Sequence, residues 1–260
     1  MTKLEEYYNK FNEEKRLLRP YGRVEYLTTM KYIEEGISGR EGLKILDVGA
    51  GTGRYAVPLS QLSHEVTAVE LVNYNLGILK KKGSSVIARR GNALNLSKYP
   101  SDYFDIILEL GPLYHLFSFE DKLQVLKEAK RVVKPGGLIY CAYCMNEYSV
   151  LTYGFKEGHI RESMESGLYT ADFQSLSTEE NLYSYVRIEE IQALSKAAGL
   201  ERVKLVASDG PANYMRQAIK EMDPETFSLF MDYHYATCER PELLGASGHT
   251  LDILKKDGCR

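Results

Sequence analysis

Short apolar runs alternate with amphipathic segments along most of the 260-residue chain. Seven such runs predict strands, because strands buried on both faces of a parallel sheet are apolar almost throughout. The segments between them repeat apolar residues every three or four positions, which is typical of helices. This alternation predicts an α/β fold, with a Rossmann-like, mostly parallel seven-stranded sheet and helices on both faces. The predicted strands span residues 43–48, 65–70, 86–88, 104–109, 137–142, 202–207 and 250–255.

The same pattern divides the chain into four regions. Two helices, at 3–18 and 24–37, are separated by a Pro–Gly break and predict an N-terminal helical cap. The strand–helix alternation stops in a segment rich in Tyr and Phe, which is either a lid over the carboxyl edge of the sheet or a packed surface subdomain. Further helices are predicted at 54–63, 74–82, 121–133, 188–198 and 225–238. The predicted regions are the cap 1–39, the core 40–145, the insertion 146–185 and the C-terminal part of the core sheet 186–260.

Composition and charge are ordinary for a globular protein. Apolar residues make up 44% and charged residues 27%, with a net charge of −3, so disorder of the whole chain is excluded. The charge balance favours neither a nucleic-acid nor a membrane partner. No apolar stretch approaches the roughly 18 residues of a membrane span, and the charged N-terminus does not resemble a signal peptide. We therefore expect a cytoplasmic protein. The 20 Tyr residues suit pocket walls as well as cores.

Four cysteines lie at positions 141, 144, 238 and 259. Cys141 and Cys144 are three residues apart on a predicted strand, so their side chains point to opposite faces. No second pair follows at the spacing of a zinc site. We expect buried, reduced, structural thiols rather than redox or metal chemistry, and we predict no metal site.

A glycine-rich turn carries the most informative chemistry. Asp47 and Gly49, Gly51 and Gly53 follow a predicted buried strand and open a helix. Glycines allow positive φ angles and close approach of a ligand, and free N–H groups at a helix start favour a polar or anionic group. Glu70 ends the next strand, where an acid meets ribose hydroxyls in nucleotide-binding units. The nicotinamide fingerprint requires glycine at position 54, which is Arg54, so an oxidoreductase is disfavoured.

The order of motifs resembles that of class I S-adenosylmethionine-dependent methyltransferases, over about residues 40–145. Besides the glycine turn, four segments match in order and spacing. They are Glu70 after the second strand, Gly91-Asn92-Ala93 after the third, 105–111 at the end of the fourth, and 129–137 before the fifth. This resemblance implies S-adenosylmethionine as cofactor and methyl transfer by in-line displacement, with a neutral thioether as leaving group.

The resemblance also implies roles for single residues. The three glycines would form the turn under the amino-acid end of the cofactor, with Asp47 near its ammonium group. Glu70 would bind the ribose hydroxyls, and Leu71 would lie beside the adenine. Asn92 stands where the family often has Asp; it or Ala93 would meet the adenine edge. Glu109 is either a cofactor or substrate contact or a structural acid.

Substrate-side candidates follow the fourth strand. His115 is a candidate base and Tyr114 a candidate wall of the acceptor pocket; the alternative for His115 is packing against the insertion. His159 and His234 are weaker candidates. The run Gly111-Pro112-Leu113-Tyr114 departs from the Asp/Asn-Pro-Pro-Tyr motif of amino-directed nucleic-acid methylases at its first and third positions.

Together these features predict a methyltransferase acting on a small molecule. The alternatives are a non-catalytic protein that binds S-adenosylmethionine or S-adenosylhomocysteine, and a macromolecule methyltransferase. The sequence indicates neither the acceptor atom nor the oligomeric state.

Overall fold

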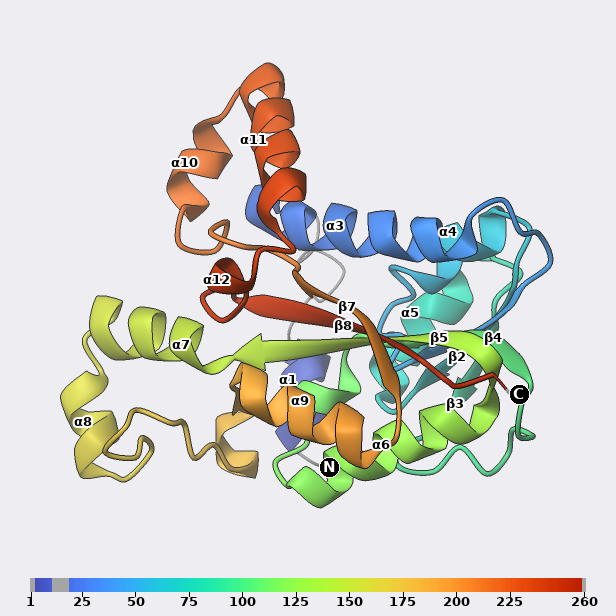
Figure 1. The fold of residues 1–260 in the computed structure, drawn as a ribbon, viewed down its shortest axis with the longest axis horizontal. Helices are drawn as coiled ribbons and strands as arrows, with labels where there is room; N and C mark the ends of the chain where they lie inside the picture. Colours follow the sequence, from blue (N-terminus) through green and yellow to red (C-terminus); the bar gives the residue numbers. More distant parts are fainter. Residues whose placement is uncertain (1–2, 11–18, 259–260) are drawn as a thin grey trace.

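The computed structural model describes residues 3–10 and 19–258. A single twisted sheet runs through its centre, with helices on both faces (Figure 1). The strand order is β3-β2-β1-β4-β5-β8-β7, and β6 pairs with the end of β5. The strands are β1 Lys44–Val48, β2 Glu65–Glu70, β3 Ile87–Arg90, β4 Phe104–Glu109, β5 Val133–Met145, β6 Tyr185–Val186, β7 Glu201–Ala207 and β8 His249–Lys255.

The topology confirms the predicted α/β class. The strands β1 to β5 pair in parallel, whereas β8 runs antiparallel between β5 and β7. All seven predicted strands are present within a few residues of their expected positions. The strand β6 was not predicted, because a strand of two residues carries no apolar period. The strand order reverses between β1 and β4, and ligands of open α/β sheets bind beside such a point.

Eleven α-helices lie in the two described ranges. Two of the longer ones begin with a side-chain cap: the Ser118 hydroxyl accepts a 3.0 Å hydrogen bond from Asp121 N, and Asp223 accepts one of 2.7 Å from Thr226 N. The helices are α1 Lys3–Lys10, α3 Pro20–Ile37, α4 Ala56–Gln61, α5 Asn73–Lys81, α6 Phe119–Val132, α7 Asn146–Ser149, α8 Ile160–Glu165, α9 Ile188–Ala197, α10 Arg216–Glu221, α11 Pro224–Thr237 and α12 Pro241–Leu244.

Two boundaries differ from the sequence prediction for identifiable reasons. The helix α3 begins at Pro20 rather than near Val24, because proline is well suited to the first turn of a helix. The strand β5 begins at Val133, four residues before its predicted start, and its first residues include Pro135 and two glycines. Of the helix predicted over 3–18, residues 11–18 lie outside the described part of the chain.

Each face of the sheet has its own apolar core. On one face, residues of α3, α4 and α5 pack on β1, β2 and β4. On the other face, α6 and α9 pack on β4 and β5 (Figure 1). Cys141 and Cys144 belong to different apolar clusters, as expected for opposite faces of one strand. Both thiols and that of Cys238 are buried and unpaired; Cys259 lies outside the described residues.

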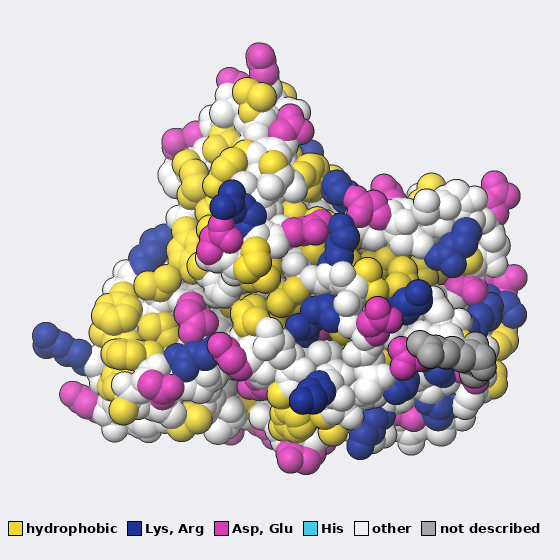
Figure 2. All heavy atoms as spheres, in the orientation of Figure 1, with side chains coloured by type: hydrophobic (Ala, Val, Ile, Leu, Met, Phe, Trp, Pro, Cys, Tyr) yellow, Lys and Arg dark blue, Asp and Glu magenta, His cyan; other side chains and the backbone are white. Residues whose placement is uncertain are grey.

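The surface view agrees with the charge balance of the sequence. On the face shown in Figure 2, Lys and Arg side chains are interspersed with Asp and Glu, and form no continuous stripe among the described residues. Hydrophobic side chains gather over the part that contains α7 and α8. Exposed large apolar side chains of that segment are Leu151, Tyr153, Phe155 and Phe173. No described helix is both long enough and apolar enough to cross a membrane.

Candidate functional site

A cavity of about 570 Å³ opens at the carboxyl ends of β1, β2 and β4. It lies beside the point where the strand order reverses, which is the expected ligand position in an open α/β sheet. Its volume is in the usual range for a cofactor site. Nine of the eleven site residues predicted from the sequence line it: Asp47, Gly49, Gly51, Glu70, Leu71, Asn92, Ala93, Tyr114 and His115.

The glycine turn forms one wall of the cavity. Its backbone conformation and its close neighbours require glycine. Gly49, Gly51 and Gly53 have φ angles of 69°, 55° and 82°, in the left-handed region that favours glycine. A Cβ on Gly49 would lie 2.8 Å from Pro112 Cδ, and one on Gly53 would overlap Leu79 Cδ1. Gly53 does not line the cavity; it allows the turn to pack against α5. The turn is therefore held close to its neighbours and presents backbone to the cavity.

Glu70 connects the turn to the end of β2. Its Oε2 atom accepts a 2.7 Å hydrogen bond from Gly51 N, and its Oε1 atom accepts one of 2.7 Å from Val72 N. Each carboxylate oxygen has two lone pairs, so both atoms retain the capacity to accept a ribose hydroxyl. The side chain is 5% exposed at the cavity wall. Its position matches the role predicted for it.

Asp47 and Arg54 bring an acidic and a basic side chain to the cavity lining. The Asp47 Oδ2 atom and the Arg54 Nε atom are buried without a hydrogen-bond partner among the described residues. Burial, reinforced by the nearby Glu70 carboxylate, raises the pKa of Asp47 to about 7. Arg54 also lies over the Tyr26 ring, 4.4 Å from its centroid. In the sequence analysis, Arg54 served only to exclude the nicotinamide fingerprint, which requires a glycine at that position. Its place in the cavity was not predicted.

The loop after β3 forms another side of the cavity. Asn92 and Ala93 line it together with Leu71. Asn92 Oδ1 accepts a 3.0 Å hydrogen bond from Leu94 N, which fixes the amide in a local turn. The loop is thus held by its own side chain, and the amide stays at the cavity wall.

Glu109 lies elsewhere than predicted for a ligand contact. It is fully buried and is not among the residues that line the cavity. Neither carboxylate oxygen has a hydrogen-bond partner within the described chain. Burial, with a contribution from Asp47, raises the pKa of Glu109 well above its ordinary value. Of its predicted roles, the placement favours the structural acid.

Tyr114 and His115 lie on a 3₁₀ turn, Pro112–His115, directly after β4. The Tyr114 hydroxyl donates to Leu110 O at 3.0 Å, so its ring forms the wall. His115 Nδ1 donates to Leu182 O at 2.9 Å, and Tyr8 Oη lies 2.8 Å from His115 Nε2. Both ring nitrogens therefore contact the cap or the insertion, and the packing role weighed in the sequence analysis is present. Its catalytic role stays a prediction.

A second cavity of about 410 Å³ adjoins the first. Tyr8 and Tyr114 line both. The second cavity is rich in tyrosine: Tyr7, Tyr8, Tyr21, Tyr114, Tyr148, Tyr153, Tyr183 and Tyr185. Neither His159, which stacks on Tyr153 with ring centroids 4.4 Å apart, nor the buried His234 lines either cavity. His249, which the sequence analysis did not consider, lines the second cavity.

Known proteins resemble this chain in both sequence and fold. Residues 46–141 match a family model described as a methyltransferase domain. Residues 46–141 are thus a methyltransferase domain, and over this part the chain is similar to class I S-adenosylmethionine-dependent methyltransferases. A demethylmenaquinone methyltransferase of Lysinibacillus sphaericus is 29% identical over 205 residues, covering 75% of this chain and 83% of that protein. A ubiquinone biosynthesis O-methyltransferase of Maricaulis maris is 33% identical over 114 residues, or 41% of this chain and 44% of that protein.

The fold similarity extends beyond the matched domain. The structure of a methyltransferase of Thermotoga maritima, described as a possible histamine N-methyltransferase, superimposes with a TM-score of 0.58. The alignment covers 98% of both chains at 20% identity, which supports the fold of this methyltransferase rather than its substrate. The cofactor of the methyltransferase is S-adenosylmethionine.

The residues present fit this cofactor. Its ammonium and carboxylate groups need an acidic and a basic partner, and Asp47 and Arg54 each bring to the cavity lining a buried atom without a hydrogen-bond partner among the described residues. The glycine turn, with Gly49 packed against Pro112, presents backbone to the same cavity. Glu70 lines this cavity as well, and its carboxylate can accept further hydrogen bonds from hydroxyl groups.

Proposed function

We propose that the methyltransferase acts on a small acceptor with an aromatic ring, bound in the tyrosine-lined cavity. The observation that carries this proposal is the shared wall: Tyr8 and Tyr114 line both the cofactor cavity and the second cavity. An acceptor in the second cavity would therefore lie next to the methyl group. The two quinone-biosynthesis methyltransferases that this chain resembles are consistent with a ring-containing acceptor.

In this proposal each cofactor group has a residue to hold it. Asp47 and Arg54 would bind the amino-acid end, Glu70 the ribose hydroxyls, and Leu71, Asn92 and Ala93 the adenine. When bound, the cofactor supplies a methyl group on a sulfonium centre with a neutral thioether as leaving group. The chain's own contribution is alignment of the acceptor and exclusion of water, which can lower a barrier by several kcal/mol.

The chain segments around the second cavity support the predicted division into regions. Tyr7, Tyr8 and Tyr21 come from region 1–39, and Tyr148, Tyr153, Tyr183 and Tyr185 come from region 146–185. We propose that these regions form a cap and a lid over the core 40–145 and the C-terminal part of the sheet, 186–260. Aromatic side chains offer ring stacking at a small cost in conformational entropy.

The proposal places this chemistry in the cytoplasm and excludes nucleic acid as the acceptor. Unpaired, buried thiols at Cys141, Cys144 and Cys238 are consistent with a reducing compartment. A cavity enclosed by tyrosine, with Arg19 and Arg216 offset by Glu25 and Glu157, offers no basic groove for a phosphate backbone.

The test is transfer of labelled methyl from S-adenosylmethionine to a panel of small phenols, with RNA and unfolded protein as competing acceptors. We expect label only in the phenols. Tyr114→Ala should reduce this transfer more than tenfold, whereas Tyr74→Ala, at an exposed position on α5, should leave it unchanged. Label in RNA or protein alone would contradict the proposal. Binding of cofactor without transfer to any acceptor would favour the non-catalytic alternative.

A further inference from the structure

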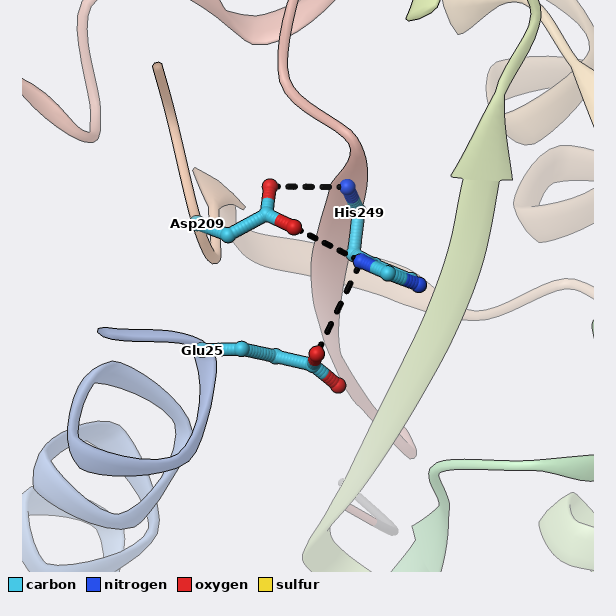
Figure 3. A group of neighbouring side chains, drawn as sticks. All are labelled: Glu25, Asp209 and His249. Carbon is cyan, nitrogen blue, oxygen red and sulfur yellow. Dashed lines mark hydrogen bonds and ion pairs between the residues drawn. The ribbon is translucent and has the colours of Figure 1, made fainter. Parts of the chain in front are cut away.

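A buried group of three titratable side chains lies at the edge of the tyrosine-lined cavity. Glu25 comes from α3, Asp209 from the loop after β7, and His249 from the first position of β8 (Figure 3). Because β7 and β8 are antiparallel, the end of one and the start of the other meet at the same sheet edge. That edge also carries the cofactor cavity, so the group lies on the acceptor side of the site.

Asp209 is held as a carboxylate by a full set of donors. Its Oδ1 atom accepts from the Ser247 hydroxyl at 2.6 Å and from His249 N at 2.9 Å. Its Oδ2 atom accepts from Asn213 Nδ2 at 2.6 Å and from His249 Nδ1 at 2.7 Å. Burial alone would raise the pKa of Asp209, but His249 and these hydrogen bonds lower it below its ordinary value. Gly248 makes the approach possible, since a Cβ there would lie 2.9 Å from Asp209 Oδ2.

This bond fixes the roles of the two ring nitrogens of His249. Since Asp209 is ionised, Nδ1 of His249 must be the donor, and the exchangeable site is Nε2. Figure 3 shows Nε2 pointing away from both carboxylates. The side chain of His249 is 18% exposed, and the residue lines the tyrosine cavity. The Tyr114 ring, on the wall shared with the cofactor cavity, lies 6.4 Å from the imidazole between centroids.

A second carboxylate strengthens the imidazole as a base. Glu25 Oε2 lies 3.7 Å from His249 Nδ1. Burial lowers the pKa of His249, but Glu25, Cys144 and Asp209 together raise it well above its ordinary value. The titratable and charged groups around the imidazole come from six elements or loops. They are Glu25, Tyr114, Cys144, Tyr148, Asp209 and, behind Asp209, His234.

We propose that Asp209 and His249 form a catalytic dyad, with His249 Nε2 as the general base that takes the proton from a phenolic hydroxyl of the acceptor. This proposal rests on the proposed function. The O–H bond breaks, its electron pair stays on oxygen, and its proton passes to Nε2. The oxygen then forms the bond to the methyl carbon as the carbon–sulfur bond breaks, with that electron pair remaining on the thioether. The imidazolium returns its proton to solvent.

The arrangement suits a hydroxyl as nucleophile. The imidazolium that forms when His249 takes the proton lies beside the oxygen that becomes negative, and stabilises that charge. The three ligand-type atoms of the group also lie within 4.8 Å of one another, a spacing that a cation could use. The four donors on Asp209 argue instead for a proton, since a metal ion would have to displace them.

The first test needs no acceptor. Among five histidines, the imidazole of His249 is assigned by NMR through its loss in His249→Asn. His159→Asn is the control, because His159 is exposed at the position before α8. We expect His249 to carry its proton on Nδ1 and to titrate above the ordinary histidine pKa. Glu25→Gln leaves the hydrogen bonds of Asp209 in place and should lower that pKa. Titration at the ordinary value, unchanged by Glu25→Gln, would overturn the dyad.

The second test uses 4-nitrophenol, whose ionisation is visible by absorbance. In the full-length protein with S-adenosylhomocysteine, the bound phenol should ionise at a pH where the free phenol does not, and His249→Asn should abolish this shift. Calorimetric binding without a spectral shift would refute the base while leaving the proposed function intact. No binding of the phenol, with normal binding of S-adenosylhomocysteine, would refute the phenolic acceptor. Activity that chelation abolishes and Zn²⁺ or Mg²⁺ restores would assign the group to a metal ion instead.

Discussion

The Glu70 carboxylate accepts a 2.7 Å hydrogen bond from the backbone nitrogen of Gly51. This contact joins the end of β2 to the middle of the glycine turn. Two features that the sequence places 19 residues apart thus become one wall of the cofactor cavity. The acid fixes the turn, and the proposed function gives it a second role, in binding the ribose hydroxyls.

Replacing Glu70 should therefore weaken cofactor binding. Glu70→Ala should cost about 1.5–3 kcal/mol of S-adenosylmethionine affinity, the range for hydrogen bonds to a charged group. Calorimetric titration measures the change. Glu65→Ala, at the exposed start of the same strand, is the matched control and should bind normally. Equal affinity of Glu70→Ala and wild type would remove Glu70 from the site.

Cofactor affinity should depend on pH through Asp47, whose pKa is raised to about 7. The ammonium group of the cofactor is bound best by the ionised carboxylate. Below pH 7 the empty site holds a proton that binding must release, so affinity should fall by up to about tenfold per pH unit. Affinity should level off above pH 7. In Asp47→Asn the fall in cofactor affinity below pH 7 should disappear. An identical dependence of affinity on pH in both proteins would contradict the binding of the ammonium group by Asp47.

Gly53 should be essential for the turn although it does not touch the ligand cavity. Gly53→Ala forces a side chain into the left-handed region and against Leu79, so we expect a loss of about 1–3 kcal/mol in unfolding free energy. Gly77→Ala is the control, because Gly77 lies in α5 with open space around it. That change should stabilise the protein by about 0.4–1 kcal/mol. Denaturant unfolding distinguishes the two, and a neutral Gly53→Ala would show that the turn tolerates a side chain.

The buried Glu109 should make the protein less stable as the pH rises. Its folded-state pKa lies above the ordinary value, so its favourable contribution is complete below about pH 4.3 and is lost as the pH rises toward the folded pKa. Glu109→Gln removes this dependence. The variant should gain stability over wild type between about pH 5 and pH 8, measured by denaturant unfolding.

Asp105 should affect the pH dependence of stability in the opposite direction to Glu109. Despite partial burial, its pKa is lowered by Lys134 and by the backbone of Lys44, so its contribution is complete above the ordinary pKa. Asp105→Asn should destabilise the protein by a similar amount at pH 5 and pH 8. If the two variants showed the same pH dependence, the burial of an uncharged Glu109 would be refuted.

The sequence was sufficient for the sheet and for most of the residues that it predicted at the first cavity. Strands β1, β2 and β4 are apolar runs with sharp ends, and the residues at and just after these ends meet at one edge. Asp47, the glycines and Glu70 could be placed at this edge from the strand pattern, whereas their individual roles came only from the family resemblance. The same logic failed for Glu109, because the last residue of a strand can point beneath the cavity as well as into it.

The acceptor side was less accessible to sequence reasoning. Asp209 and His249 lie 40 positions apart, and each follows or precedes an ordinary strand. Their meeting depends on the antiparallel pairing of β7 with β8, which no local pattern reveals. The signals that existed were the glycines beside them: Gly248 permits the close approach to Asp209, and Gly210 packs against His234 of α11. Likewise, the tyrosines of 146–185 could be recognised as unusual but could not be assigned to a cavity.

The most direct test of the central claim is calorimetric titration of the purified protein with S-adenosylmethionine and S-adenosylhomocysteine, with a nicotinamide dinucleotide as control. The structure predicts micromolar binding of the first two and none of the third. A folded protein that binds neither S-adenosyl compound would contradict the account of the cofactor cavity.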